Sequence, residues 1–156
     1  MAKVWQWTAD RVAHACLHQF MDRSAVIIPN CYFTGYEADL LVVDSRNLKL
    51  IDIEIKVDRS DLKADINKDK WNVSRWVNEN GVSTRKEFRR EFAPKVWKHY
   101  FAMPSALWKP ELEEFIPKTS GVITFSDYKY SGSGTQVKVV RRAKTNPQAK
   151  PVSDRD

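Results

Sequence analysis

The sequence predicts an α/β protein, with helices stacked on one central sheet in two or three layers. The chain has 156 residues, 42% of them hydrophobic and 12% aromatic, which is enough for one domain with a sizeable core. Two apolar segments, 36–43 and 48–57, have the composition of buried strands. Segments with helical spacing lie on both sides of this pair, and further strand-like segments follow.

The N-terminal part predicts one helix and an interrupted strand before the buried pair. Apolar residues recur at helical spacing from Thr8 to Asp22, and Thr8 can cap the first turn. The apolar tripeptides 26–28 and 31–33 flank a Pro-Asn pair and predict a short strand with a break. The turn-forming residues 44–47 allow the two buried strands to pair as a hairpin.

Two further helices and a helical turn are expected in the second half. Apolar residues at helical spacing predict a helix that Ser60 caps and that ends by Asn80-Gly81. Residues 84–87 match a capping box and predict a short helix. One or two helical turns are expected at 110–115, which opens with a proline.

The remaining segments predict strands and a tail. Three segments have strand composition, namely 97–103, 121–125 and 136–140. A flexible Ser-Gly turn is expected at 131–134. Residues 143–156 are rich in polar and basic residues and proline, and we expect them to be a disordered basic tail. The chain is interpreted as a single domain over 1–142 followed by this tail.

Composition argues against membrane and secreted classes. No apolar run approaches the length of a membrane span, and the N-terminus lacks the apolar region of a signal peptide. The two cysteines, Cys16 and Cys31, do not have the spacing of a metal motif. We expect them to be buried thiols in a reducing cytoplasm, with no membrane partner.

The net charge of +6 is unevenly distributed. Residues 1–58 hold six Lys or Arg against eight Asp or Glu, whereas residues 59–99 hold eleven against six. A phosphate-binding surface beside a metal site has such a distribution. A solvated helical face has it equally well, so charge alone does not choose between these interpretations.

Charged residues inside the buried strands are the most informative feature. Asp52, Glu54 and Lys56 alternate with isoleucines and therefore project from one face of their strand. The same rule puts Glu37 and Asp39 on one side of the preceding strand, and a hairpin brings Asp39 close to Glu54. Two carboxylates beside an ammonium can hold a hard cation such as Mg²⁺. The alternative is an exposed cross-strand charge network on a one-sided strand.

The pattern of Asp39, Glu54 and Lys56 resembles the PD-(D/E)XK nuclease superfamily. Downstream blocks are similar to those of small bacterial and phage proteins of the MmcB-like DNA-repair branch, and they lie at 58–62, 64–65, 68–71 and 99–104. The similarity covers roughly residues 35 to 142.

The resemblance implies a restriction-endonuclease-like core, in which a central mixed sheet flanked by helices presents a metal site at one edge. It implies that Asp39, Glu54 and the carbonyl of Ile55 coordinate Mg²⁺ or Mn²⁺ and that Lys56 assists the attacking water. The expected activity is a DNA endonuclease or repair nuclease, with RNA a weaker alternative. A homodimer and the cytoplasm of a bacterial or phage-infected cell are further expectations.

Several nearby residues keep more than one interpretation. Lys70 either extends to solvent or points toward the carboxylates; the resemblance favours the second and makes Lys70 a candidate catalytic residue. Asp52 and Glu37 are hydrogen-bond acceptors behind the metal, ligands of a second metal, or solvated charges. Many members of the superfamily carry a metal-binding Glu on the first helix, which residues 9–22 lack. A rival hypothesis is therefore a binding module that keeps the fold without catalysis.

Basic and aromatic residues after residue 70 predict a nucleic-acid surface. The candidate phosphate contacts are Arg75, Arg85, Lys86, Arg89 and Arg90. Trp71 and Trp76 either stack on unpaired bases or belong to the core, and the core is favoured for at least one. Segment 78–94 is interpreted as an insertion that serves as a lid, a DNA-gripping element or a dimer contact.

Overall fold

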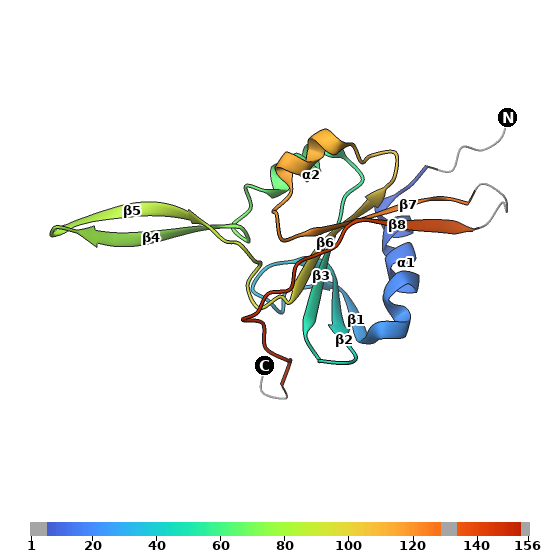
Figure 1. Ribbon diagram of the computed structural model, residues 1–156, viewed down its shortest axis with the longest axis horizontal. Helices are drawn as coiled ribbons and strands as arrows, with labels where there is room; N and C mark the ends of the chain where they lie inside the picture. Colours follow the sequence, from blue (N-terminus) through green and yellow to red (C-terminus); the bar gives the residue numbers. More distant parts are fainter. Residues whose placement is uncertain (1–5, 129–133, 154–156) are drawn as a thin grey trace.

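A mixed sheet of six strands forms the centre of the protein in a computed structural model that describes residues 6–128 and 134–153 (Figure 1). The elements in chain order are α1 (Ala9–Phe20), the 3₁₀ helix η1 (Met21–Arg23), β1 (Ser24–Cys31), β2 (Ala38–Asp44), β3 (Leu50–Ile55), α2 (Arg59–Asp65), β4 (Asn72–Glu79), β5 (Val82–Arg89), β6 (Lys98–Pro104), the 3₁₀ helix η2 (Pro110–Phe115), β7 (Gly121–Asp127) and β8 (Thr135–Arg141). The predicted α/β class is confirmed.

The central sheet has the strand order β1-β2-β3-β6-β7-β8. β3, β6 and β7 run parallel to one another, and the remaining pairs are antiparallel. β2 and β3 form the predicted hairpin, in which Leu40 lies opposite Ile53 and Leu41 opposite Asp52. Continuing this register by one residue places Asp39 opposite Glu54 and on the same face, as the sequence predicted.

Helices cover both faces of the sheet. α1 packs through Val12 and Phe20 against a face that includes Ile51 and Ile53 of β3. On the other face Leu62 of α2 belongs to a second core with residues of β6, β7 and η2. Because side chains alternate along a strand, the charged residues of β3 point toward the α2 side.

The long helix predicted from Ser60 to Asn80-Gly81 is wrong beyond Asp65. α2 ends there, and its N-cap is Asp58 rather than Ser60, because the Asp58 carboxylate accepts from the backbone N–H groups of Ser60 and Asp61. The following residues form β4 and β5 instead. The short helix predicted at 84–87 is also wrong, since these residues belong to β5.

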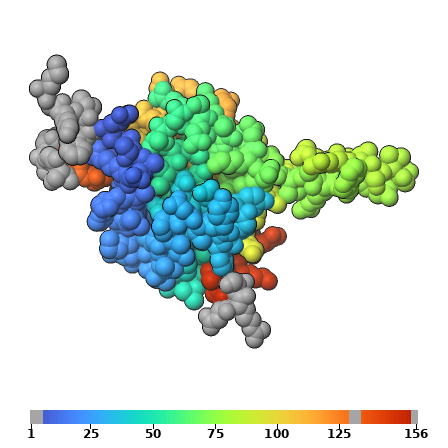
Figure 2. All heavy atoms as spheres, turned by 180° about the vertical axis from the view of Figure 1, so that it is seen from behind, coloured from blue at the N-terminus to red at the C-terminus, as the bar shows by residue number. Residues whose placement is uncertain are grey.

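Asn80 and Gly81 join β4 and β5 as a two-residue turn, and both have positive φ, 54° and 83°. An Asn-Gly pair with this backbone is the preferred turn of a tight hairpin, because its twist matches that of the flanking strands. β4 and β5 pair only with each other in the described structure. They form an arm that extends from the body, here called the ribbon (residues 72–89; Figure 2). The ribbon therefore takes the place of the insertion expected at 78–94.

The other predicted elements agree with the structure at the level of their type. The expected break at Pro29 is absent, since β1 pairs with β2 through Pro29. Both cysteines are free thiols, and Cys16 is buried whereas Cys31 is half-buried. No helix among the described residues is long and apolar enough to cross a membrane. Most of the turn expected at 131–134 lies outside the described residues.

The segment expected to be disordered instead lies against the body as far as Ser153, the last described residue. Asn146 donates from its backbone N–H to Trp97 O (2.8 Å) and from its side chain to Val96 O (3.0 Å). Val152 N donates to Leu48 O at 2.8 Å, and Ala149 is buried. Backbone hydrogen bonds and burial hold this segment, which composition alone does not reveal.

Candidate active site

Two charged residues of β3 and the lysine directly after the strand are almost fully buried. Asp52 is 0% exposed, Glu54 4% and Lys56 2%. Buried charges must be paired with opposite charges or accept hydrogen bonds to persist. The alternative of an exposed charge network on β3 is therefore wrong, because α2 and the loop after it cover this face.

Glu54 is the centre of the charge cluster. Its Oε1 lies 3.1 Å from Lys56 Nζ and 2.6 Å from Lys68 Nζ, and its Oε2 lies 3.2 Å from Lys70 Nζ. Three ammonium groups, one directly after β3 and two from the loop after α2, thus surround one carboxylate.

A second buried carboxylate, Asp65 at the end of α2, shares two of these ammonium groups. Asp65 Oδ1 lies 2.9 Å from Lys56 Nζ and 2.6 Å from Lys68 Nζ. Asp61, one helical turn earlier, lies 3.2 Å from Lys56 Nζ through Oδ2. The short helix α2 therefore supplies carboxylates that balance the charge of Lys56.

The loop after α2 delivers Lys68 and Lys70. Trp71 anchors it, since its ring is 0% exposed and its Nε1 donates to Asp65 Oδ2 at 3.3 Å. Trp71 is thus the core tryptophan, whereas Trp76 is 73% exposed on the ribbon. Lys70 points toward the carboxylates as predicted, although from a loop rather than from a helix, and its Nζ lies 2.9 Å from Asp52 Oδ2.

Asp39 enters the site from β2. Its Oδ2 accepts a hydrogen bond of 2.7 Å from Ile55 N. A polar hollow of about 220 Å³ opens here and is lined by Glu37, Asp39, Glu54, Ile55, Lys56, Asp61 and Lys68. The four residues expected to form the metal and water site, which are Asp39, Glu54, Ile55 and Lys56, therefore lie around one hollow, and Lys70 lies behind it.

The surroundings shift the pKa values of these groups in opposite directions. Burial alone would raise the pKa of Glu54, but Lys70, Lys56 and Lys68 hold it far below its ordinary value. Burial raises the pKa of Asp39, and the hydrogen bond from Ile55 N only partly offsets this. Burial would lower the pKa of Lys56, but Glu54 and Asp65 raise it above the ordinary value. Glu54 is therefore ionised and Lys56 protonated at neutral pH.

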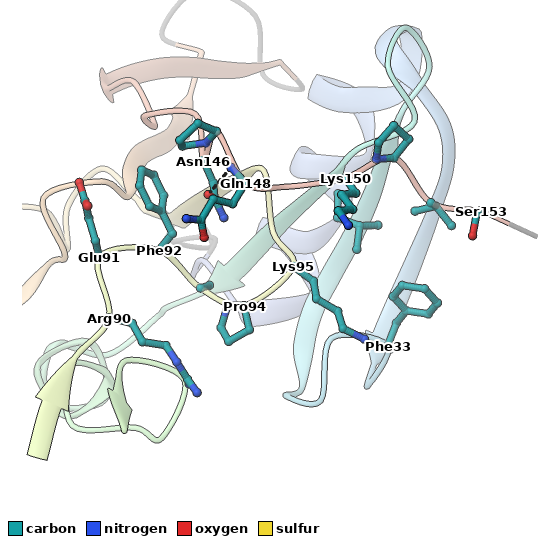
Figure 3. Close-up of a pocket in the computed structure, with 15 residues that line it drawn as sticks. Phe33, Arg90, Glu91, Phe92, Pro94, Lys95, Asn146, Gln148, Lys150 and Ser153 are labelled. Carbon is teal, nitrogen blue, oxygen red and sulfur yellow. Dashed lines mark hydrogen bonds between the residues drawn. The ribbon is translucent and has the colours of Figure 1, made fainter. Parts of the chain in front are cut away.

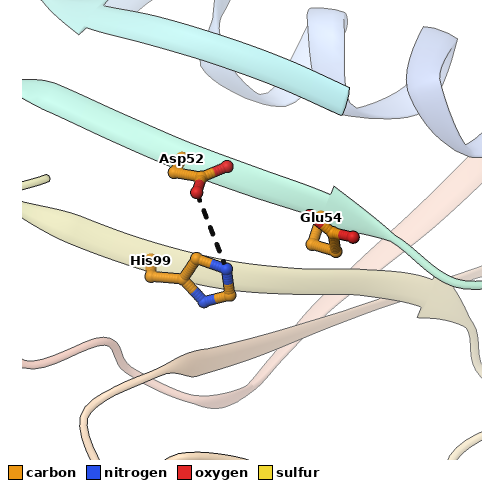
Figure 4. A group of neighbouring side chains, drawn as sticks. All are labelled: Asp52, Glu54 and His99. Atoms are coloured by element: carbon orange, nitrogen blue, oxygen red, sulfur yellow. Dashed lines mark ion pairs between the residues drawn. The ribbon is translucent and has the colours of Figure 1, made fainter. Parts of the chain in front are cut away.

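A second group of ligand atoms lies deeper in the sheet. Asp52, Glu54 and His99 each have one such atom within 4.8 Å of the others (Figure 4). Burial raises the pKa of Asp52 to about 6, against the opposing effect of Lys70. Burial and the neighbouring Lys70 lower the pKa of His99 well below its ordinary value. Lys70 Nζ already contacts both carboxylates, so a lysine takes the place of a metal in this group.

A hydrogen bond of 2.9 Å joins His99 Nδ1 and Ser120 Oγ. The other ring nitrogen of His99, Nε2, lies 3.8 Å from Asp52 Oδ2. His99 thus lies between Ser120 and Asp52, in the order of contacts that is found in a Ser-His-Asp catalytic triad. Ser120 is 0% exposed and does not line either hollow described in this subsection. The three residues therefore form a buried polar contact between β6 and its neighbours.

A larger hollow of about 940 Å³ lies between the loop before β6 and the C-terminal segment (Figure 3). Its lining includes Phe33, Arg90, Lys95 and Asn146. It contains neither the carboxylates nor the lysines of the charge cluster, and we assign no chemistry to it.

The predicted phosphate contacts divide into two groups. Arg75, Arg85 and Lys86 are exposed on the ribbon. Arg89 and Arg90 instead fix its root: Arg89 Nη2 donates to Ile66 O, and Arg90 Nη1 donates to Tyr36 Oη and to the carbonyl oxygens of Asp69 and Lys70.

Two members of the cluster, Asp65 and Lys68, are not among the predicted site residues, because both lie in the segment that the sequence predicts as one long helix. α1 contributes no residue to the lining of the polar hollow, since it packs on the opposite face of the sheet. No family model, curated protein or solved structure matches the chain.

Proposed function

We propose that this protein is a metal-dependent nuclease that hydrolyses phosphodiester bonds in DNA, with a PD-(D/E)XK-like site on a restriction-endonuclease-like core. The observation that carries the proposal is the polar hollow at the end of β3. Two carboxylates, Asp39 and Glu54, line it together with Ile55 and the buried ammonium of Lys56.

The donors of the hollow suit a hard divalent cation. Carboxylate and carbonyl oxygens are the ligands that Mg²⁺ and Mn²⁺ prefer, and Asp39, Glu54 and the Ile55 carbonyl are the residues that would hold the ion. The carboxylates of the hollow already attract one cationic group. The side chain of Lys68 is 45% exposed at the rim, and its ammonium pairs with Glu54 and Asp65. A bound cation would polarise the phosphate and lower the pKa of a water molecule.

Lys56 has a defined electrostatic role in this proposal. Because its pKa is raised, its side chain does not take a proton from water at neutral pH. A buried, fixed ammonium instead stabilises the negative charge that develops on the phosphate oxygens in the transition state. Glu54 and Asp65 hold this ammonium in place.

The rival candidate is a nucleic-acid-binding or protein-binding module without catalysis. The pairing of all three lysines with carboxylates favours it, because such a cluster is self-contained without a metal. The absence of an α1 residue from the lining of the hollow also favours it.

A nicking assay separates the two candidates. Supercoiled plasmid, single-stranded DNA and a branched junction are incubated with the protein in Mg²⁺, Mn²⁺ or EDTA. The nuclease predicts metal-dependent cleavage that is lost in Asp39→Asn. Asparagine can still accept the hydrogen bond from Ile55 N, so this variant removes the charge while keeping the local contact.

The matched control is Glu37→Gln, which removes one charge from an exposed residue that lines the same hollow. Cleavage should persist in this control. Cleavage that survives in Asp39→Asn would overturn the proposed role of Asp39 at the metal site. No cleavage on any substrate, with DNA still bound, would overturn the nuclease in favour of the binding module.

A further inference from the structure

The ribbon extends from the body, and none of its residues is buried. All eight residues of β5 are exposed, and the residues of β4 are exposed or half-buried. Only its root touches the body in Figures 1 and 2. An isolated two-stranded hairpin is only marginally stable in water, so an arm of this kind gains most from a partner that surrounds it.

Cationic residues lie on both faces of the ribbon. Trp76 and Arg85 are cross-strand partners on one face, and Arg75 and Lys86 are the adjacent partners on the other. Arg75 has no ion-pair partner within the described ranges. Lys86 pairs with Glu79, and Arg85 Nε lies 4.0 Å from Glu87 Oε1. Exposed pairs of this kind are weak and exchange readily for phosphate.

This arrangement fits a partner with negative charge on both sides of the ribbon. The groove of a duplex has a phosphate backbone along each wall, whereas a single strand or a flat surface meets one face. The major groove of B-DNA is about 12 Å wide and admits a two-stranded ribbon. Eight residues of strand extend about 27 Å, the length of roughly eight base-pair steps.

The identity of the duplex follows from the same dimensions. The major groove of an RNA duplex is deep and narrow and does not admit protein elements of this width. Trp76, at 73% exposure beside Arg85, presents a flat apolar surface at the middle of the ribbon, where the C5-methyl group of a thymine can contact it.

The root of the ribbon adjoins the candidate active site. Arg90 N donates to Trp71 O at 2.7 Å, and the Arg90 side chain binds carbonyl oxygens of Asp69 and Lys70. A duplex held by the ribbon therefore lies beside the loop that carries Lys68.

We infer that the ribbon is an arm that binds the major groove of double-stranded DNA through Arg75, Arg85, Lys86 and Trp76. The inference rests on the proposed function only in treating that DNA as a substrate. The binding itself needs neither a metal nor cleavage.

The test is fluorescence anisotropy of a labelled duplex with the full-length chain in EDTA. The triple variant Arg75→Ala/Arg85→Ala/Lys86→Ala should bind on the order of ten-fold or more weakly. The slope of log affinity against log salt should fall by about three, one for each phosphate contact. Trp76→Ala should weaken binding at all salt concentrations, and Trp76→Phe should restore part of it.

The matched control is Lys109→Ala/Lys118→Ala/Lys138→Ala, which removes the same charge from exposed positions outside the ribbon. This control should bind like the wild type. Equal affinity of the two triple variants would overturn the inference. So would a ribbon-dependent preference for single-stranded DNA or for duplex RNA, or a loss of self-association without a loss of DNA binding.

These outcomes are separable from the fate of the nuclease. Ribbon-dependent duplex binding by a protein that cleaves nothing supports the arm and refutes the activity. Cleavage that requires Asp39, together with unchanged duplex affinity in the ribbon triple variant, supports the activity and refutes the arm.

Discussion

Lys68 Nζ lies 2.6 Å from Glu54 Oε1, at the rim of the polar hollow. Lys68 is the most accessible of the three ammonium groups around Glu54, with a side chain 45% exposed against 2% for Lys56 and 3% for Lys70. Lys68 can therefore move away from Glu54 into solvent more easily than the two buried lysines can. We expect it to compete with a divalent cation for Glu54.

Lys68→Met should therefore increase the affinity for Mn²⁺ by about five-fold, which corresponds to roughly 1 kcal/mol for a partly exposed pair. Titration calorimetry with Mn²⁺ measures this directly. The control is Lys118→Met, which removes an exposed charge away from the hollow and should leave the affinity unchanged. Weaker Mn²⁺ binding in Lys68→Met would show that the lysine does not compete.

Glu54→Gln should lower the free energy of unfolding at pH 7 by about 3–5 kcal/mol, because it leaves the buried ammonium groups of Lys56 and Lys70 with one carboxylate partner fewer. Urea unfolding measures the loss. Glu113→Gln breaks the exposed pair with Arg141 and should cost less than about 1 kcal/mol. A loss of cleavage in a Glu54 variant therefore carries weight only when the variant is shown to be folded.

The same variant should respond differently to acid. Because the lysines depress the pKa of Glu54, its contribution to stability is present above the unfolded value of about 4.5 and is lost as the pH falls below it. The difference in the free energy of unfolding between the wild type and Glu54→Gln should therefore decrease as the pH falls below about 5. An advantage that stays constant on acidification would contradict the depressed pKa.

Asp52 should give the opposite dependence. Its folded pKa of about 6 lies above the ordinary value of 3.8, so its stabilising effect is present below pH 3.8 and is lost as the pH rises through 6. The stability of the wild type relative to Asp52→Asn should fall by roughly 3 kcal/mol across this window. Urea unfolding of both proteins in EDTA at several pH values measures this difference. The charged and titratable groups that neighbour Asp52 are Glu54, Lys70 and His99. A relative stability that rises with pH would show that Lys70 controls the titration.

Asn146→Ala should destabilise the protein by about 1–3 kcal/mol, because it removes a buried donor to Val96 O and the acceptor for Gln148 N. Thermal unfolding compares it with Gln136→Ala, an exposed change in β8. Equal stability of the two variants would show that residues 143–153 contribute little to the fold.

The sequence predicted the β2–β3 hairpin from the turn-forming residues 44–47. It also predicted that Asp39 approaches Glu54, because every second side chain of a strand points to the same face. The ribbon was missed for a local reason: Leu62, Ile66, Val73 and Val77 also fit a helical spacing. The Asn80-Gly81 pair is typical both of a helix end and of a hairpin turn, and in the structure it forms the turn.

The places of Asp65 and Lys68 depend on contacts that sequence periodicity does not contain. α2 stops at Asp65, and the chain then turns so that Trp71 enters the core and Lys68 reaches back to Glu54. Those turns are fixed by tertiary packing. The charge pattern of β3 indicated a site, but only the fold shows that lysines balance it.

Arg90 gives the ribbon a mechanical connection to the charge cluster. Its guanidinium donates hydrogen bonds to the carbonyl oxygens of Asp69 and Lys70. The Lys70 ammonium in turn forms ion pairs with Asp52 and Glu54. Residues 69 and 70 are thus held from two sides, through their carbonyl oxygens by the root of the ribbon and through the Lys70 ammonium by the carboxylates of β3. The position of the Lys70 ammonium therefore depends on the root of the ribbon as well as on β3.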